Sequence, residues 1–304
     1  MGCPTCPREN AEAMMILVKC LRAAGCARES AAVCSATARL LAPELGPSCQ
    51  CPPPALRAWL LCGKARSCAT CSPAADRGLA DAFVAAGGGE AVREAMNVHA
   101  NCLEVVREGS RVLAAACERA GGEAATKLAA VGAHHLCATA SMRFPCNTAV
   151  AECCARCVFW VVMKTPAAAW EHASPRCARA LSDGLADAFH GGSYAFHALG
   201  ALTALLRQRE QSAHIRGTAL QGCVNALRSP IGERSDVRGA AFIFLYVIGR
   251  EGNAAEARRH GAVREAARWL AAARPEDLSE SDGWVWHAQQ FLEDARNAAD
   301  KEEQ

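Results

Sequence analysis

Cysteine and histidine form the densest group of chemically capable side chains in this sequence. Seven of them lie close together: His134, His135, Cys137, Cys146, Cys153, Cys154 and Cys157. Zinc takes four thiolate or imidazole ligands in a structural site, and Cys137, Cys146, Cys154 and Cys157 are a candidate set. The alternative is packing, because Cys154 and Cys157 share a helix face with Val158 and Val161. We expect packing with no bound metal or cofactor, and keep the four-cysteine set as the alternative.

The chain has 19 cysteines, and three pairs have the spacing Cys-x-x-Cys. Cys3/Cys6 and Cys68/Cys71 are too far apart in sequence for a zinc ribbon, and Cys154/Cys157 is the third pair. A redox Cys-x-x-Cys belongs beside a βαβ pattern, and no strand pattern is visible. The odd number of cysteines and the length argue against a disulfide framework and favour a reducing compartment.

The first residues, Met1-Gly2-Cys3-Pro4, suggest lipidation. Myristoylation prefers Met-Gly-x-x-x-Ser/Thr, and a neighbouring cysteine would take palmitate as the second anchor. Position 6 is Cys6 rather than Ser or Thr, and Pro4 is unusual in that pattern. Acylation of Gly2 and Cys3 is therefore the alternative to an ordinary N-terminus. It is the one route by which we expect the chain to reach a membrane.

No catalytic constellation is present in the sequence. Neither Gly-x-Ser-x-Gly nor Gly-x-x-x-x-Gly-Lys-Ser/Thr occurs. The triplet Gly87–Gly89 precedes Glu90, whose charge is wrong for cradling phosphate. Arg258-Arg259-His260 is either a basic patch that faces a partner or a solvated helix face. We predict no catalytic residue and no enzymatic activity.

Composition points to helices. Ala makes up 67 of 304 residues, only 5% are aromatic, and five are Ile. Ala is the best helix former, whereas strands favour aromatic and β-branched side chains. A net charge of +2 argues against a nucleic-acid-binding protein. The longest apolar runs are about half of what a membrane-spanning helix needs, and the N-terminus does not have the form of a signal peptide.

Helical periodicity is visible along most of the chain. Met14, Met15, Leu17, Val18 and Leu21 form an apolar stripe in the segment 11–24. Ser72-Pro73 and Ser174-Pro175 resemble helix starts, with Ser as the cap and Pro in the first turn. The segment 49–54, with three prolines, interrupts the helical pattern.

Internal similarity organises these elements. The sequence of Gly78–Phe83 recurs as Gly184–Phe189, and Ala91–Ala95 recurs as Ala262–Ala266. Within Asp236–Leu270 the pattern predicts a long helix that ends at Gly249–Gly252. A short helix capped by Asn253 follows, and a third helix begins after Gly261.

This order of helices and Gly corners resembles the junction between armadillo repeats, and Gly87–Met163 resembles two further repeats. The chain is thus similar to the armadillo-like helical-repeat family. The resemblance implies an all-α fold, a right-handed α-solenoid of about six to seven repeats. We expect repeats over residues 72–292. Residues 1–71 would be a Cys/Pro-rich helical extension or atypical capping repeats, and residues 293–304 a polar tail.

An α-solenoid buries its core by stacking neighbouring units and presents an extended surface. The resemblance therefore implies a non-enzymatic scaffold, or a structural subunit of a larger assembly, that binds a protein partner along that surface. The alternative function is a Cys/His metal-binding or redox-linked module. We expect a cytoplasmic protein, membrane-tethered only if acylated, with membership of a cytoskeletal assembly left open.

Overall fold

The computed structural model describes residues 7–41, 73–166, 168, 174–186, 191–206, 212–273 and 283–302. Fifteen α-helices and one short 3₁₀-helix, η4 (Pro230–Glu233), account for most of these residues, and no strand occurs among them. The expected all-α class is confirmed for this part of the chain. The sequence places the best helix former, Ala, throughout these segments.

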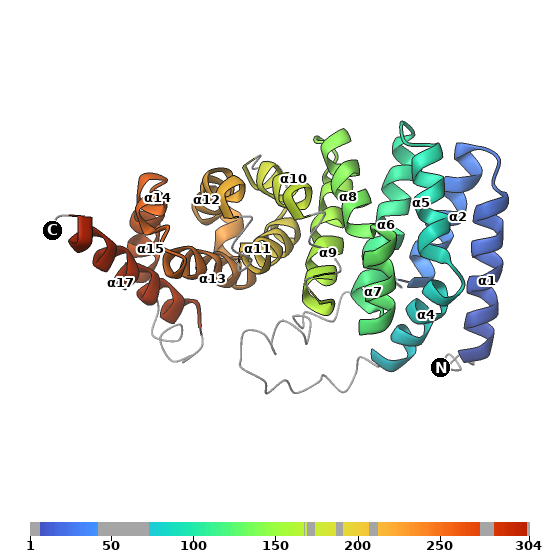
Figure 1. The fold of residues 1–304 in the computed structure, drawn as a ribbon, viewed down its shortest axis with the longest axis horizontal. Helices are drawn as coiled ribbons and strands as arrows, with labels where there is room; N and C mark the ends of the chain where they lie inside the picture. The colour runs from blue at the N-terminus through green and yellow to red at the C-terminus, as the bar shows by residue number, and fades with distance from the viewer. Residues whose placement is uncertain are drawn as a thin grey trace. The chain divides into compact units, whose positions relative to one another are not determined.

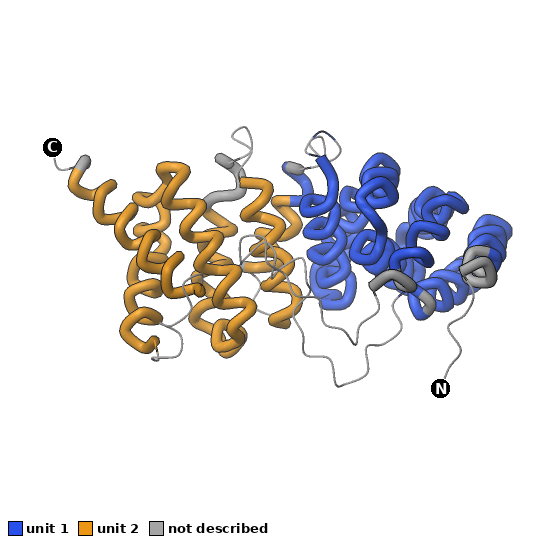
Figure 2. Tube along the Cα trace, turned by 90° about the horizontal axis from the view of Figure 1, so that it is seen from below, with its two compact units in different colours: residues 1–50, 68–177 blue, residues 51–67, 178–304 orange. Residues whose placement is uncertain are grey.

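The described chain divides into two compact units, which Figure 2 distinguishes by colour. Unit 1 covers residues 1–50 and 68–177, and unit 2 covers residues 51–67 and 178–304. The first six helices of unit 1 are α1 (Pro7–Ala23), α2 (Ala27–Leu41), α4 (Pro73–Ala85), α5 (Gly88–Val98), α6 (Leu103–Arg119) and α7 (Gly122–Val131). The next two are α8 (Ala133–Arg143) and α9 (Thr148–Lys164), and α10 (Ser174–Ala186) crosses the division.

In unit 1, three consecutive helices pack against the three helices that follow them in the sequence. The contacts join α4 to α7, α5 to α8 and α6 to α9, and α2 also packs against α6. Figure 1 shows α6 and α9 running alongside each other in this unit. The triplets α4–α5–α6 and α7–α8–α9 thus stack with first helix on first, second on second and third on third. A single triplet could not bury its apolar faces alone.

The interface between α6 and α9 holds the centre of the unit 1 core. Val105, Leu113 and Cys117 of α6 are fully buried, as are Val150 and Cys157 of α9. Small side chains predominate here, so the two helix backbones can approach closely. Asn147 caps α9 by accepting a hydrogen bond from the Val150 amide at 3.0 Å, which anchors the start of this helix.

Unit 2 contains α11 (Gly192–Leu206), α12 (Ser212–Arg228), η4 and α13 (Ser235–Arg250). They are followed by α14 (Ala254–Arg259), α15 (Ala262–Ala271) and α17 (Trp284–Glu302). The helices α11, α13 and α17 pack in succession, and α12 packs against α14 and α15. Phe242 and Phe244 of α13 and Phe291 of α17 are fully buried, so aromatic side chains fill this core.

Glycines in the left-handed region form three of the corners. Gly87, Gly132 and Gly261 have φ values of 77°, 84° and 81°, which favour glycine because it lacks a Cβ. They precede α5, α8 and α15 directly. The similar segments Ala91–Ala95 and Ala262–Ala266 therefore both lie in helices that follow such a corner, although Ala262 begins α15 whereas Ala91 comes three residues after the first residue of α5.

Three details differ from the expectations. Met15 is 47% exposed, whereas Met14, Val18 and Leu21 of the same stripe are buried. Asn253 precedes α14 as expected but makes no capping bond, because its side-chain amide donates to the Glu251 carbonyl instead. The segment 293–302 continues α17 rather than forming a separate tail. Across the described ranges, no helix has the length and apolar character to cross a membrane.

Candidate functional site

A cluster of thiols lies within unit 1, around α6, α8 and α9. The Sγ atoms of Cys117 and Cys157 are 3.7 Å apart, and both side chains are fully buried. Cys137 of α8 is also fully buried. The Cys177 thiol donates to the His134 carbonyl at 3.8 Å. The sequence motif is therefore brought together in part, as a contiguous buried thiol cluster.

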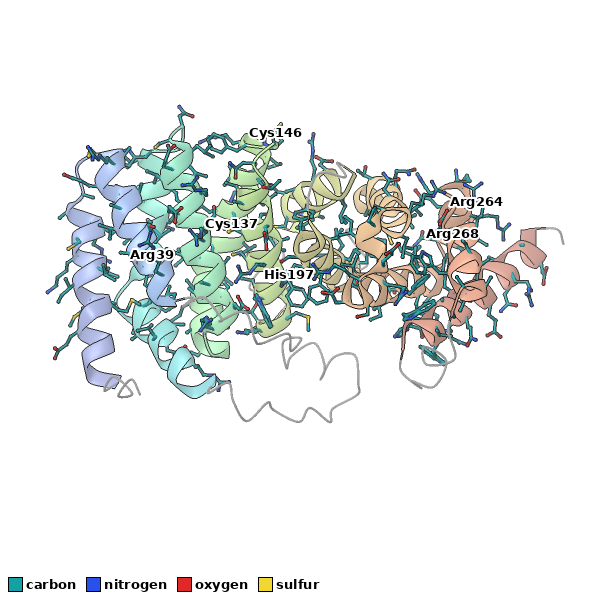
Figure 3. All side chains as sticks on the ribbon, turned by 180° about the vertical axis from the view of Figure 1, so that it is seen from behind. Arg39, Cys137, Cys146, His197, Arg264 and Arg268 are labelled. Carbon is teal, nitrogen blue, oxygen red and sulfur yellow. The ribbon has the colours of Figure 1, made fainter. Side chains whose placement is uncertain are left out.

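The fourth candidate zinc ligand lies apart from the others. Cys146 is exposed, whereas Cys137, Cys154 and Cys157 are buried. Figure 3 places Cys146 at one end of the helices and Cys137 near their middle. Within the described ranges, no group of three or more His, Cys, Asp or Glu side chains is arranged to hold a metal ion. The four-cysteine set is thus not assembled as a tetrahedral site.

Burial sets the protonation state of these thiols. It raises the pKa of Cys153 and of Cys177 to about 12, and the pKa of Cys154 also lies well above its usual value because of burial. Hydrogen bonds that the Cys157 thiol makes with Cys117 and Cys137, together with burial, raise its pKa. Thiolate is the form that binds metals and attacks disulfides. The geometry therefore favours protonated thiols that fill space.

His134 belongs to the same buried region. Its side chain is 4% exposed, and burial lowers its pKa to about 4, with a further contribution from His135. Neither ring nitrogen has a hydrogen-bond partner among the described residues. His134 is therefore a neutral core residue, whereas Nε2 of the neighbouring His135 lies 2.9 Å from the Arg176 guanidinium.

Long-range hydrogen bonds of side chains have a recurring sequence separation. Gly121 donates to Asp81, 40 residues away, at 2.9 Å, and Arg143 donates to the Ala100 carbonyl, 43 residues away, at 2.8 Å. In unit 2, Trp269 donates to the Leu227 carbonyl, 42 residues away, at 3.1 Å. Most such bonds span 37 to 47 residues. These side-chain hydrogen bonds therefore join helices that are separated by a recurring distance along the chain.

An aromatic patch lies where α13 and α17 pack together in unit 2, with Trp286 exposed and Tyr246 and His287 half-buried. The ring centroids of Tyr246 and Trp286 are 5.4 Å apart, and His287 lies 5.4 Å from Tyr246 and 4.9 Å from Trp286. Trp286 is 41% exposed, whereas Trp284, on the same helix, is buried and stacks on Phe242. Large exposed aromatic side chains are typical of the centres of protein interfaces.

In the basic motif Arg258-Arg259-His260, the first and third side chains contact neighbouring helices and the second is exposed to solvent. Arg258 donates to the Ala295 carbonyl of α17 at 2.6 Å, and the His260 ring contacts the Gln221 side chain at 3.4 Å. Arg259 is exposed and makes no hydrogen bond or ion pair with the described parts of the chain. Sequence reasoning missed the more organised basic feature nearby, in which Arg228 and Arg268 both bind the buried Glu265 at 2.8 Å.

Several predicted site residues lie outside the described residues. These are the acylation candidates Gly2 and Cys3 and the pairs Cys3/Cys6 and Cys68/Cys71. No family model, curated protein or solved structure matches the chain.

Proposed function

We propose that this chain is an armadillo-like α-solenoid that acts as a non-enzymatic scaffold or structural subunit and binds a protein partner. The observation that carries this proposal is a recurring separation along the sequence: the long-range hydrogen bonds made by side chains join residues that are 37 to 47 positions apart. A single globular bundle has no reason to repeat one separation. A stack of similar helix groups does, because each group meets the next at equivalent positions.

The stacking of equivalent helices supports the same proposal. Within unit 1, each helix of the α4–α5–α6 triplet packs on its counterpart in α7–α8–α9. Within unit 2, the third helices α11, α13 and α17 pack in succession. The left-handed corners at Gly87, Gly132 and Gly261 mark the start of the second helix in three groups. A right-handed solenoid of six to seven repeats accommodates these relations.

The third helices are the surface on which we place the partner. In an armadillo-like solenoid these helices line a continuous groove, and α13 and α17 carry the aromatic patch of Tyr246, Trp286 and His287, in which Trp286 is exposed. An aromatic pair supplies large contact area at low cost in side-chain entropy. We favour this function over a Cys/His module because the described thiols of that motif are buried and protonated or, in Cys146, exposed apart from them.

The test is affinity purification with the intact protein under mild lysis, comparing wild type with two variants. Trp286→Ser removes the exposed aromatic surface of α17. Val98→Ser removes an exposed apolar side chain, 70% accessible, on the second helix α5. A partner that wild type and Val98→Ser retain and that Trp286→Ser loses supports the proposal. The absence of any stoichiometric partner, or equal retention by both variants, overturns the assignment of this surface.

A further inference from the structure

Two arginines of unit 2 bind one buried carboxylate, and a third lies near the same helix start. The Nε atom of Arg228 on α12 and the Nε atom of Arg268 on α15 each donate to Glu265 at 2.8 Å. Glu265 is only 5% exposed. Burial alone would raise its pKa, but the two guanidinium groups hold that pKa below its usual value. The ion pairs therefore fix the positions of both arginines at the surface.

The third arginine approaches from the Gly261 corner. A Cβ built on Gly261 would lie 3.1 Å from Nη2 of Arg228 and 3.8 Å from Nη2 of Arg264, so both guanidinium groups lie at the start of α15. Figure 3 shows Arg264 and Arg268 side by side on this helix. We call Arg228, Arg264 and Arg268 the α15 arginine cluster. Two of its members, Arg228 and Arg268, are held by ion pairs with Glu265. Arg228 and Arg264 both lie near Gly261.

The cluster carries an excess of exposed positive charge. Glu265 neutralises one of its three guanidinium charges, and Arg259 adds another at the end of α14. Arg264 and Arg259 are exposed and make no hydrogen bond or ion pair with the described residues. Their donors are therefore available to a ligand, and the fork of a guanidinium group matches a carboxylate in two parallel hydrogen bonds.

We propose that the α15 arginine cluster is a docking site for an acidic segment, rich in Asp and Glu, of a protein partner. This inference rests on the proposed function and names the chemistry of one contact. The cluster lies on α12 and α15, whereas the aromatic patch lies on the third helices α13 and α17, so the two surfaces are tested separately.

Two observations favour an acidic protein segment over other anionic partners. A single-stranded nucleic acid would need an accessible ring for base stacking. The ring of Trp269, on the same helix α15, is already covered by Arg238 at 5.0 Å and Arg268 at 5.2 Å. A membrane surface would favour exposed apolar side chains beside the basic ones. The large apolar side chains exposed in the described residues are Met15, Ile16, Val98, Met142 and Trp286, and none lies on α12, α14 or α15.

The experiment is fluorescence anisotropy with the full chain and a labelled deca-glutamate peptide. Wild type is expected to bind at about 50 mM salt and to weaken steeply at about 500 mM, because the contacts are between exposed charges. The double variant Arg259→Glu with Arg264→Glu is expected to lose about tenfold or more in affinity through like-charge repulsion. Neither arginine has a described partner, so this variant should keep the thermal melting profile of wild type, checked by circular dichroism.

The matched control is Arg93→Glu with Arg250→Glu, which changes net charge equally at two exposed arginines on α5 and α13. Affinity within about threefold of wild type in this control supports a located site rather than a general charge effect. Equal weakening in both double variants overturns the proposal, as does no binding by wild type at low salt. Tighter binding of a single-stranded RNA oligomer or of phosphatidylserine vesicles, lost in the Arg259/Arg264 variant, overturns the assignment to an acidic protein segment.

Discussion

The ammonium group of Lys164, at the end of α9, lies 3.0 Å from the carbonyl oxygen of Cys117 near the end of α6. It also donates to the carbonyls of Glu118 and Ala120, and it lies 4.9 Å from the centroid of the Trp160 ring. The last carbonyls of a helix have no partner within the helix. One lysine therefore caps the helix that stacks beside its own, and it joins two equivalent helix ends.

Replacing this lysine tests how much the tie stabilises the stack. Lys164→Met keeps the apolar stem over Trp160 but leaves the carbonyls of α6 without their charged donor. We expect the free energy of unfolding to fall by about 1–3 kcal/mol, measured by urea denaturation. Lys127→Met, at an exposed i,i+4 ion pair with Glu123, is the control and should change stability far less. An equal effect of the two variants would show that the cap contributes nothing beyond an ordinary surface charge.

Acid should destabilise the protein through His134. Burial lowers its pKa in the folded state to about 4, against 6.5 for an ordinary histidine. Between these values the unfolded chain binds a proton that the folded chain excludes, so stability falls as the pH drops through this window. The difference corresponds to about 3 kcal/mol once the pH is below both values.

The measurement is urea denaturation at neutral pH and near pH 4.5, for wild type and for His134→Leu. The variant removes the titrating ring, so its stability should change less between the two pH values than that of wild type. If the pH dependence of the two proteins is the same over this window, another group is responsible and the buried position of His134 does not control it.

The segment from Asp236 to Leu270 was predictable helix by helix because the residues that end and begin its helices act locally. The order of helix, Gly turn, short helix, Gly corner and helix is confirmed by α13, α14 and α15. A left-handed corner needs glycine, and Gly261 supplies it at the end of a basic turn. Local rules of this kind can be read from one sequence without knowledge of the neighbouring helices.

The buried face of a helix is harder to predict, because it depends on which neighbours cover it. In α1 the apolar stripe is wide enough to allow two faces. The neighbours α2, α4 and α5 cover Met14 and Val18 and leave Met15 exposed. Nothing in the sequence of α1 specifies the direction from which those neighbours approach, so the stripe alone does not distinguish Met15 from Met14.

The two surfaces for which we propose a function were predictable only to the extent that they lie within one helix. The pair Glu265 and Arg268, three residues apart, is visible in the sequence as one helix face. Arg228 joins it from 37 residues earlier, and this contact requires the register between neighbouring helix groups. The same limitation hid the approach of Tyr246 to Trp286. A consistent repeat register along the sequence is the signal that would have identified both pairs.

Removal of metal should leave the protein unchanged. The thiols Cys153, Cys154 and Cys157 are buried with raised pKa values, so the thiolate form that zinc requires is disfavoured. We expect purified protein to contain less than about one zinc per ten chains and its melting temperature to be unaffected by a chelator. Stoichiometric zinc, or a melting temperature lowered by the chelator, would restore the Cys/His module as the function.

Two glycines of unit 2 should respond to alanine with opposite signs. A Cβ on Gly232, in η4, would lie 2.8 Å from the Ala226 carbonyl oxygen and 2.9 Å from Leu227 backbone atoms, and backbone cannot rotate away. A Cβ on Gly239, within α13, would meet nothing within 4 Å. Gly232→Ala should therefore lower the free energy of unfolding by about 1–3 kcal/mol through overpacking. Gly239→Ala should raise it by about 0.5–1 kcal/mol, because alanine loses less entropy than glycine in a helix.

Both variants can be measured by urea denaturation beside wild type, with the slope of the transition checked for constancy. The pair tests the placement of η4 against the end of α12, because only that contact makes position 232 intolerant of a methyl group. If Gly232→Ala is as stable as wild type, the close approach of η4 to Ala226 and Leu227 is wrong. The position of Arg228 at the end of α12 would then also be wrong, and with it the geometry of the α15 arginine cluster.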